Sequence, residues 1–161
     1  GSLNRQVGGE PVFPYIDPSL FQASSKRTWN GRPDDDPSTW RRSIYVFSKR
    51  SIPLPMLEVF DKPDTISSCA RRNRSTVAPQ ALILMNNSFV ALHARRFAER
   101  LKAEAGEDEA KLIRLAFEHA FSRLPTATEV ERAQAFLATS KDALTDFCQA
   151  LFNANEFVYI P

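Results

Sequence analysis

Apolar residues recur at helical spacing through the second half of the chain, from about residue 79 to residue 159. Val90, Ala94, Phe97 and Leu101, for example, follow one another at intervals of three or four residues, with charged residues between them. This pattern is typical of an amphipathic helix that buries one face and exposes the other. The second half is therefore predicted to be almost wholly helical.

Capping residues indicate where these helices begin and end. Asn87-Ser88 and Asp108 each stand just before an apolar stripe, and Gly106 lies between the two stripes. Thr126 and Glu129 have the spacing of a capping box, in which the threonine hydroxyl accepts from the glutamate N–H and the glutamate side chain reaches back. We expect helices over about residues 79–85, 88–105, 108–121, 126–137 and 144–152.

The segment from Pro79 to Met85 has a different pattern, because it is apolar on nearly every side. A helix without a polar face is usually buried. Proline suits the first turn of a helix, where backbone N–H groups lack intrahelical partners. The segment is therefore predicted to form a short helix that is central and buried, with the amides of Gln80 and Asn86 bonding to backbone at its two ends.

The first half is irregular by comparison, since nine of the eleven prolines lie at or before Pro79. Its best strand candidate is residues 41–50, where β-branched and aromatic residues lie between basic ends. A short helix is expected after Pro55. The predicted fold class is thus mainly α: a compact bundle of about five helices, with a proline-rich irregular N-terminal half and at most one short strand pair.

Length and composition favour a single domain over residues 1–161, because 161 residues that are 43% hydrophobic suffice for one core of ordinary size. Residues 1–78 would wrap the helical part, residues 79–161. Gly1-Ser2 is typical of a cleaved expression tag, so we expect a piece of a longer protein. No apolar run approaches the roughly 20 residues that span a bilayer, and no membrane insertion is expected.

Positive charge is concentrated in one stretch, SCARRNRS at residues 68–75, which contains Arg71, Arg72 and Arg74. Together with Arg41 and Arg42, these guanidinium groups could bind a sulfate, phosphate or uronate. They could instead pair with internal carboxylates such as Asp61 and hold the irregular half on the helices, which is the interpretation we favour. Nucleic acid is not an expected partner, because the net charge is only +2 and aromatic residues do not alternate with the basic ones.

Catalytic and metal-binding patterns are weak. Cys69 is the only cysteine for which a pairing with His93 or His119 is conceivable, and nothing places either histidine beside it. The two histidines and scattered carboxylates lack the spacing of a metal site, and the acidic run 34–36 lacks that of a calcium loop. We assign no catalytic residue and no metal. Whether Cys69 and Cys148 pair stays open.

Several separated motifs resemble those of a known family. They are RRSIYVF at residues 41–47, KR at 49–50, PM at 55–56, FDKP at 60–63, Cys69, RR at 71–72 and PQALILMN at 79–86. In this order they are similar to the C-terminal module of large planctomycete and verrucomicrobial proteins, the domain of unknown function 1553 of PSD-one type. GG at 8–9, PY at 14–15 and LFNANEF at 151–157 fit the same family, so the resemblance covers nearly the whole chain.

The resemblance implies an exported protein with other domains upstream, often including a cytochrome-c-like haem domain. This chain has no Cys-x-x-Cys-His, so no haem or other cofactor is expected in it. The family has no established activity from which catalytic residues could be transferred. We therefore expect a non-catalytic accessory module that packs on upstream domains of the same polypeptide and binds an anionic glycan. The alternative is a composite enzyme site, polysaccharide-acting or redox-linked, in which Arg71, Arg72 and Asp61 line a cleft completed by a missing domain.

Overall fold

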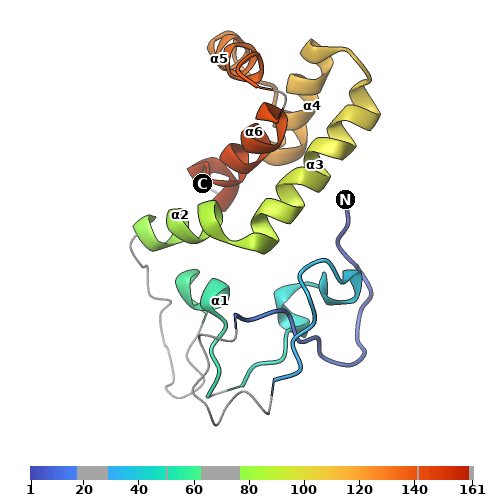
Figure 1. Cartoon of the computed structure of the whole chain (residues 1–161), viewed down its shortest axis with the longest axis vertical. Coiled ribbons are helices and arrows are strands. Elements are labelled where there is room, and N and C mark those ends of the chain that lie inside the picture. Colours follow the sequence, from blue (N-terminus) through green and yellow to red (C-terminus); the bar gives the residue numbers. More distant parts are fainter. Residues whose placement is uncertain (18–28, 50, 63–76, 141, 160–161) are drawn as a thin grey trace. The chain divides into compact units, whose positions relative to one another are not determined.

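The computed structural model describes residues 1–17, 29–49, 51–62, 77–140 and 142–159 (Figure 1). The chain divides into two compact units, Gly1–Ile83 and Leu84–Pro161, and the boundary between them lies within helix α2 (Val77–Asn86). This division reflects dense packing inside each unit and does not test whether either folds alone. The single domain expected over residues 1–161 therefore stays a prediction.

The fold class is confirmed, because the described residues are mainly helical and contain only isolated bridges in place of strands. Five helices have ten or more residues: α2, α3 (Ser88–Ala105), α4 (Glu109–Phe121), α5 (Ala127–Leu137) and α6 (Ala143–Phe152). Two others are shorter, α1 (Pro55–Val59) and α7 (Asn155–Val158). In the described part of the chain, none of these helices is both long and apolar enough to cross a membrane.

The first unit consists mostly of extended segments and short turns around a small aromatic core. Ile16, Trp29 and Ile52 are buried, and Phe13 packs on them with its ring 5.3 Å from that of Trp29. The indole N–H of Trp29 donates to the Pro14 carbonyl at 3.0 Å, which satisfies the one polar group of this buried ring. Two 3₁₀ turns complete the described part, η3 (Pro37–Thr39) and η4 (Ser43–Tyr45).

The strand predicted over residues 41–50 was wrong for its described part, 41–49. The N–H of Tyr45 donates to the Arg42 carbonyl at 2.9 Å, and that of Val46 donates to the Ser43 carbonyl at 3.1 Å, so the backbone turns as η4. In the described residues, three isolated bridges are all that remains of the expected pairing: Arg41 with Asn4, Val46 with Val12, and Lys49 with Ile52. β-branched and aromatic residues favour a strand only where a neighbouring strand runs alongside, and here the neighbouring segment contains glycines and prolines.

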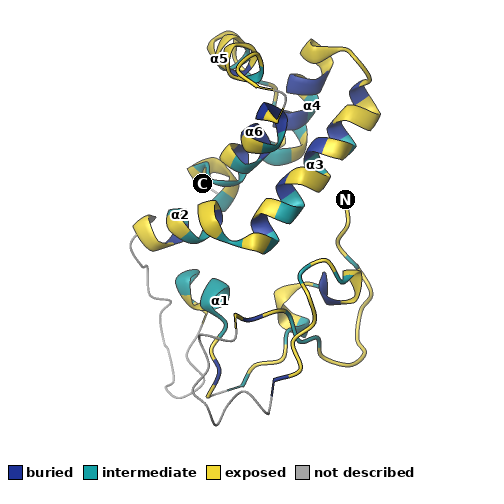
Figure 2. Cartoon of the chain, in the orientation of Figure 1, coloured by how far each residue is buried: buried dark blue, intermediate teal, exposed yellow. Residues whose placement is uncertain are grey.

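The second unit is a bundle of the helices α3 to α7. Helix α3 packs against α4 and α6, α5 packs against α4 and α6, and α7 against the same two helices. Figure 2 shows the buried positions of α3, α4 and α6 facing one another. Leu101, Ile113 and Cys148 are the largest side chains that are almost fully enclosed. The apolar stripes read from the sequence thus form this core.

The capping residues expected for these helices are confirmed. The Asn87 side chain accepts from the backbone N–H groups of Phe89 and Val90, and that of Asp108 accepts from Lys111 N–H at 2.9 Å. Thr126 and Glu129 form the complete capping box. Gly106 ends α3 with a φ of 66°, a left-handed backbone that glycine adopts without steric cost.

The prediction that the helix at residues 79–85 is buried all round was wrong. Helix α2 begins at Val77, two residues before Pro79, and buries Gln80 and Leu84 on one side. Leu82 is 61% exposed and Met85 is 62% exposed. An apolar sequence shows only that no face of the helix carries charged side chains. Whether each face is buried depends on how much surrounding chain covers it.

Candidate functional site

The predicted arginine cluster is only partly within the described residues. Arg71, Arg72 and Arg74 lie outside them, as does Cys69, so internal pairing of these arginines with carboxylates and anion binding by them both stay predictions. The described members are Arg41 and Arg42, which both precede the 3₁₀ turn η4, with Arg42 as its N-cap. Their surroundings differ, although they are adjacent in sequence.

Arg41 is engaged by the N-terminal segment of its own chain. Its Nη2 donates to the carbonyls of Gln6 (2.9 Å) and Gly8, and its Nη1 donates to that of Glu10 at 3.1 Å. The guanidinium also lies over the Tyr45 ring, with Cζ 3.9 Å from the centroid. Planar guanidinium groups suit both contacts, forked hydrogen bonding and stacking. Arg41 therefore fastens residues 6–10 to the turn at 43–45, and Arg42 is the exposed neighbour.

The predicted structural polar residues lie at the ends of α1 and α2. The Gln80 side chain is buried and donates from Nε2 to the Val59 carbonyl at 3.0 Å, which ties α2 to the end of α1. Asp61 follows α1 with a φ of 57°, a left-handed conformation that aspartate tolerates better than most residues. Asn86 is the exposed last residue of α2.

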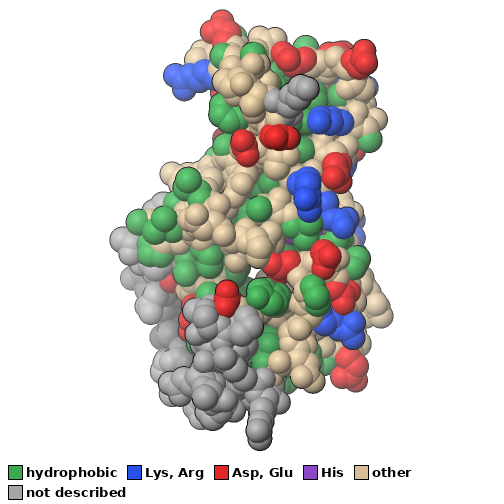
Figure 3. All heavy atoms as spheres, in the orientation of Figure 1, with side chains coloured by type: hydrophobic (Ala, Val, Ile, Leu, Met, Phe, Trp, Pro, Cys, Tyr) green, Lys and Arg blue, Asp and Glu red, His purple; other side chains and the backbone are tan. Residues whose placement is uncertain are grey.

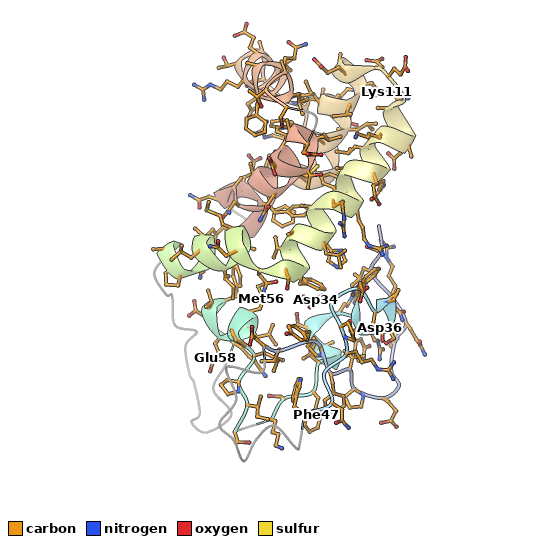
Figure 4. All side chains as sticks on the ribbon, viewed as in Figure 1. Asp34, Asp36, Phe47, Met56, Glu58 and Lys111 are labelled. Atoms are coloured by element: carbon orange, nitrogen blue, oxygen red, sulfur yellow. The ribbon has the colours of Figure 1, made fainter. Side chains whose placement is uncertain are left out.

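The acidic run 34–36 acts as a turn in this structure. Asp36 caps η3 by accepting from Ser38 N–H at 2.9 Å, and its carboxylate pairs with Arg32 at 3.1 Å (Figure 4). These hydrogen bonds, the one from Ser38 first, lower the pKa of Asp36. The carbonyl of Asp34 accepts from the Trp40 indole at 2.8 Å. Among the described residues, no group of three or more histidine, cysteine or acidic side chains is arranged to hold a metal.

A three-way charged cluster, which the sequence analysis did not identify, links α4, α5 and α7. Arg123 donates to both carboxylate oxygens of Glu129 (2.9 and 2.8 Å) and to both of Glu156 (2.7 and 2.8 Å). Paired hydrogen bonding to Arg123 holds the pKa of Glu129 down to about 2 and also lowers that of Glu156. The capping-box spacing was the only signal of this cluster in the sequence, because the Glu129 carboxylate both closes the capping box and accepts from Arg123.

A second cluster joins α3 to α4 and contains a histidine. Glu104 Oε1 accepts from Arg100 Nε at 2.6 Å, and Glu104 Oε2 lies 2.9 Å from Nε2 of His119. These contacts, the one with His119 first, lower the pKa of Glu104 to about 2. The lowered pKa means that the folded state favours the ionised Glu104 carboxylate. The stability that these contacts contribute is therefore present above the ordinary carboxyl pKa and is lost as the pH falls toward 2. The sequence had suggested only a conceivable pairing of His119 with Cys69.

Cys148 is not placed for chemistry. Burial raises the pKa of its thiol to about 12, which keeps it protonated and unreactive at neutral pH. His93 lies on α3 with its ring 4.3 Å from that of Phe89. Cys69, the cysteine considered for a pair with a histidine, lies outside the described residues.

Helix α2 instead presents an apolar face. Ala78, Pro79, Leu82 and Met85 are all exposed, the last three at intervals of three residues, and α2 contains no charged residue. Figure 3 shows hydrophobic side chains gathered over this helix. Gln149 of α6 donates from Nε2 to the carbonyls of Leu84 (3.1 Å) and Met85 (2.8 Å). The C-terminal turn of α2 is therefore held through its backbone, and the side chain of Met85 takes no part in these hydrogen bonds.

Comparison with known proteins gives one assignment. The sequence model of PSD1, protein of unknown function (DUF1553), matches residues 1–137. The chain belongs to this family. Neither a curated protein nor a solved structure is significantly similar to it. Membership of the DUF1553 family confirms the resemblance found in the motifs, and it supports an uncharacterised domain without specifying a ligand or a reaction.

Proposed function

We propose that this DUF1553 domain is a non-catalytic interaction module that packs, through the exposed face of α2, on another domain of an exported polypeptide. The observation that supports this most directly is the exposure of Leu82 and Met85 on a helix that has no charged side chain. Contiguous apolar surface that stays exposed commonly marks a site of protein contact. Helical spacing of the face suits a partner that lays apolar side chains along it.

The two methionines of the chain provide a direct test of the exposed face. Met85 is 62% exposed, whereas Met56 of α1 is half-buried (Figure 4). Dilute peroxide should therefore oxidise Met85 several-fold faster than Met56, measured by peptide mass spectrometry, because sulfoxide formation follows exposure. In the longer polypeptide, Met85 should become protected while Met56 keeps its rate. Equal rates in the isolated domain would contradict the proposal.

Substitution can then separate contact through α2 from contact elsewhere. Leu82→Gln should weaken binding to the remainder of the polypeptide, produced separately, by about tenfold or more, because burying a leucine contributes about 1.5–3 kcal/mol. Leu124→Gln is the matched control, since Leu124 is 60% exposed but lies between α4 and α5. Equal effects of the two substitutions would place the contact away from α2.

An anionic glycan remains the proposed ligand of the module. Arg41 is already engaged by three carbonyls, so we assign glycan contact to Arg42 and to Arg71, Arg72 and Arg74. A sulfated glycan should raise the melting temperature of the domain, a neutral glycan of equal length should not, and Arg42→Gln should reduce the shift. A shift seen only with the longer polypeptide would favour the composite enzyme site. No shift with either protein would remove both glycan proposals.

A further inference from the structure

Two charged clusters tie α4 to its neighbours, and they differ in how they respond to pH. The cluster at Arg123 consists of one guanidinium and the two carboxylates of Glu129 and Glu156, all charged near neutral pH. The cluster of Arg100, Glu104 and His119 contains a histidine, the side chain whose charge ordinarily changes between pH 5 and 8. Of the two clusters, only the second contains an imidazole.

The geometry of this cluster forces His119 to choose between two partners. Its Nε2 lies 2.9 Å from Glu104 Oε2 and 3.3 Å from Arg100 Nη2. A ring nitrogen that bears a proton can donate to the carboxylate, and one that presents a lone pair can accept from the guanidinium, but it cannot do both. Side chains lean toward the N-terminus of their own helix, and α3 and α4 are antiparallel. The side chains of Glu104 and His119 therefore lean toward each other.

We propose that His119 is a proton-operated cross-link between α3 and α4: its protonated ring donates to Glu104, and its neutral ring accepts from Arg100. In the protonated form, Glu104 receives two charged donors, since Arg100 Nε stays 2.6 Å from its other oxygen. In the neutral form, the ion pair of His119 with Glu104 is lost, and a hydrogen bond from the charged Arg100 to the neutral ring replaces it. The state of one ring nitrogen thus sets how firmly α4 is held along this edge of α3.

The other charged groups on elements that pack against α4 have different partners or positions. Glu118 of α4 pairs with Arg114 at 3.5 Å. Beyond α3, the charged residues on the neighbouring helices are Glu129, Glu131 and Arg132 of α5, Asp146 of α6 and Glu156 of α7. Glu129 and Glu156 are held by Arg123. Glu131, Arg132 and Asp146 are exposed, and among the described residues none of them forms an ion pair with His119. The Phe97 ring of α3 lies edge-on to the His119 ring, with the two centroids 6.2 Å apart.

A double-mutant cycle at two pH values tests the cross-link. Glu104→Gln, His119→Gln and the double variant are unfolded in urea at about pH 5.5 and about pH 8, where histidine is ordinarily charged and neutral. At the lower pH, the coupling between the two residues should change the unfolding equilibrium constant by about two- to fivefold, as for exposed ion pairs. At the higher pH the coupling should be clearly smaller. Equal coupling at the two pH values would overturn the proposal.

A matched cycle and a spectroscopic measurement complete the test. Glu118→Gln is the control, because Glu118 precedes His119 directly and its side chain has the same 36% exposure as that of Glu104. Its coupling to His119 should not depend on pH. Nitrogen-15 NMR of the imidazole should show Nε2 of His119 without a proton at pH 8 and with one at pH 5.5, with His93 as the second histidine signal. A proton on Nε2 at both pH values would exclude the exchange with Arg100.

Discussion

Replacing Leu101 by alanine is expected to lower the free energy of unfolding of the helical unit by about 2–5 kcal/mol. Leu101 has 0% exposure and lies on α3 in the core shared with α4 and α6. Removing three carbons there loses the transfer free energy of the side chain and leaves a cavity that the surrounding helices fill only in part. Equilibrium urea denaturation followed by far-ultraviolet circular dichroism measures the loss.

Leu82→Ala is the matched control for this prediction, because it makes the same chemical change at a residue that is 61% exposed. Its effect on the free energy of unfolding should stay within about 0.5 kcal/mol, as is usual for surface substitutions. Similar losses at Leu101 and Leu82 would mean that α2 is buried after all. The comparison therefore tests the core of the bundle and the exposed face of α2 in one experiment.

Gly31→Ala is expected to destabilise the aromatic core of the first unit by about 1–3 kcal/mol through steric overlap. A Cβ atom at this position would lie 2.8 Å from the Pro14 carbonyl oxygen and 2.8 Å from Nε1 of Trp29. Those two atoms form the hydrogen bond that satisfies the buried indole. The added methyl would have to separate them, so near-ultraviolet circular dichroism and the indole N–H resonance of Trp29 should both change.

Asn30→Ala tests the same loop without placing an atom in that contact. Asn30 is exposed and adjacent to Gly31, so its substitution should leave the stability within about 0.5 kcal/mol and the Trp29 resonance unmoved. An unchanged Trp29 signal in Gly31→Ala would show that the loop does not approach Pro14 as closely as in this structure.

The candidate sites were partly visible in the sequence. The spacing of Thr126 and Glu129 predicted a capping box, but it did not indicate that the same carboxylate would accept hydrogen bonds from Arg123. Glu104 and His119 are fifteen residues apart, and no local pattern connects them. Arg41 was read as a possible anion ligand because its charge is evident, while the carbonyls that surround it come from residues 6–10 and carry no sequence signal.

The features that could be predicted from the chain alone are local ones and family membership: the helices of the second half, their caps at Asn87, Asp108 and Thr126, and the DUF1553 motifs. Helical period and capping depend on neighbours within a few residues, so they can be read from a single chain. Tertiary structure decided the rest, including the turn at residues 43–45, the exposure of Leu82 and Met85, and the partners of Arg123 and His119. Each of these depends on which distant segment comes to lie beside the residue, and that is fixed only when the whole chain packs.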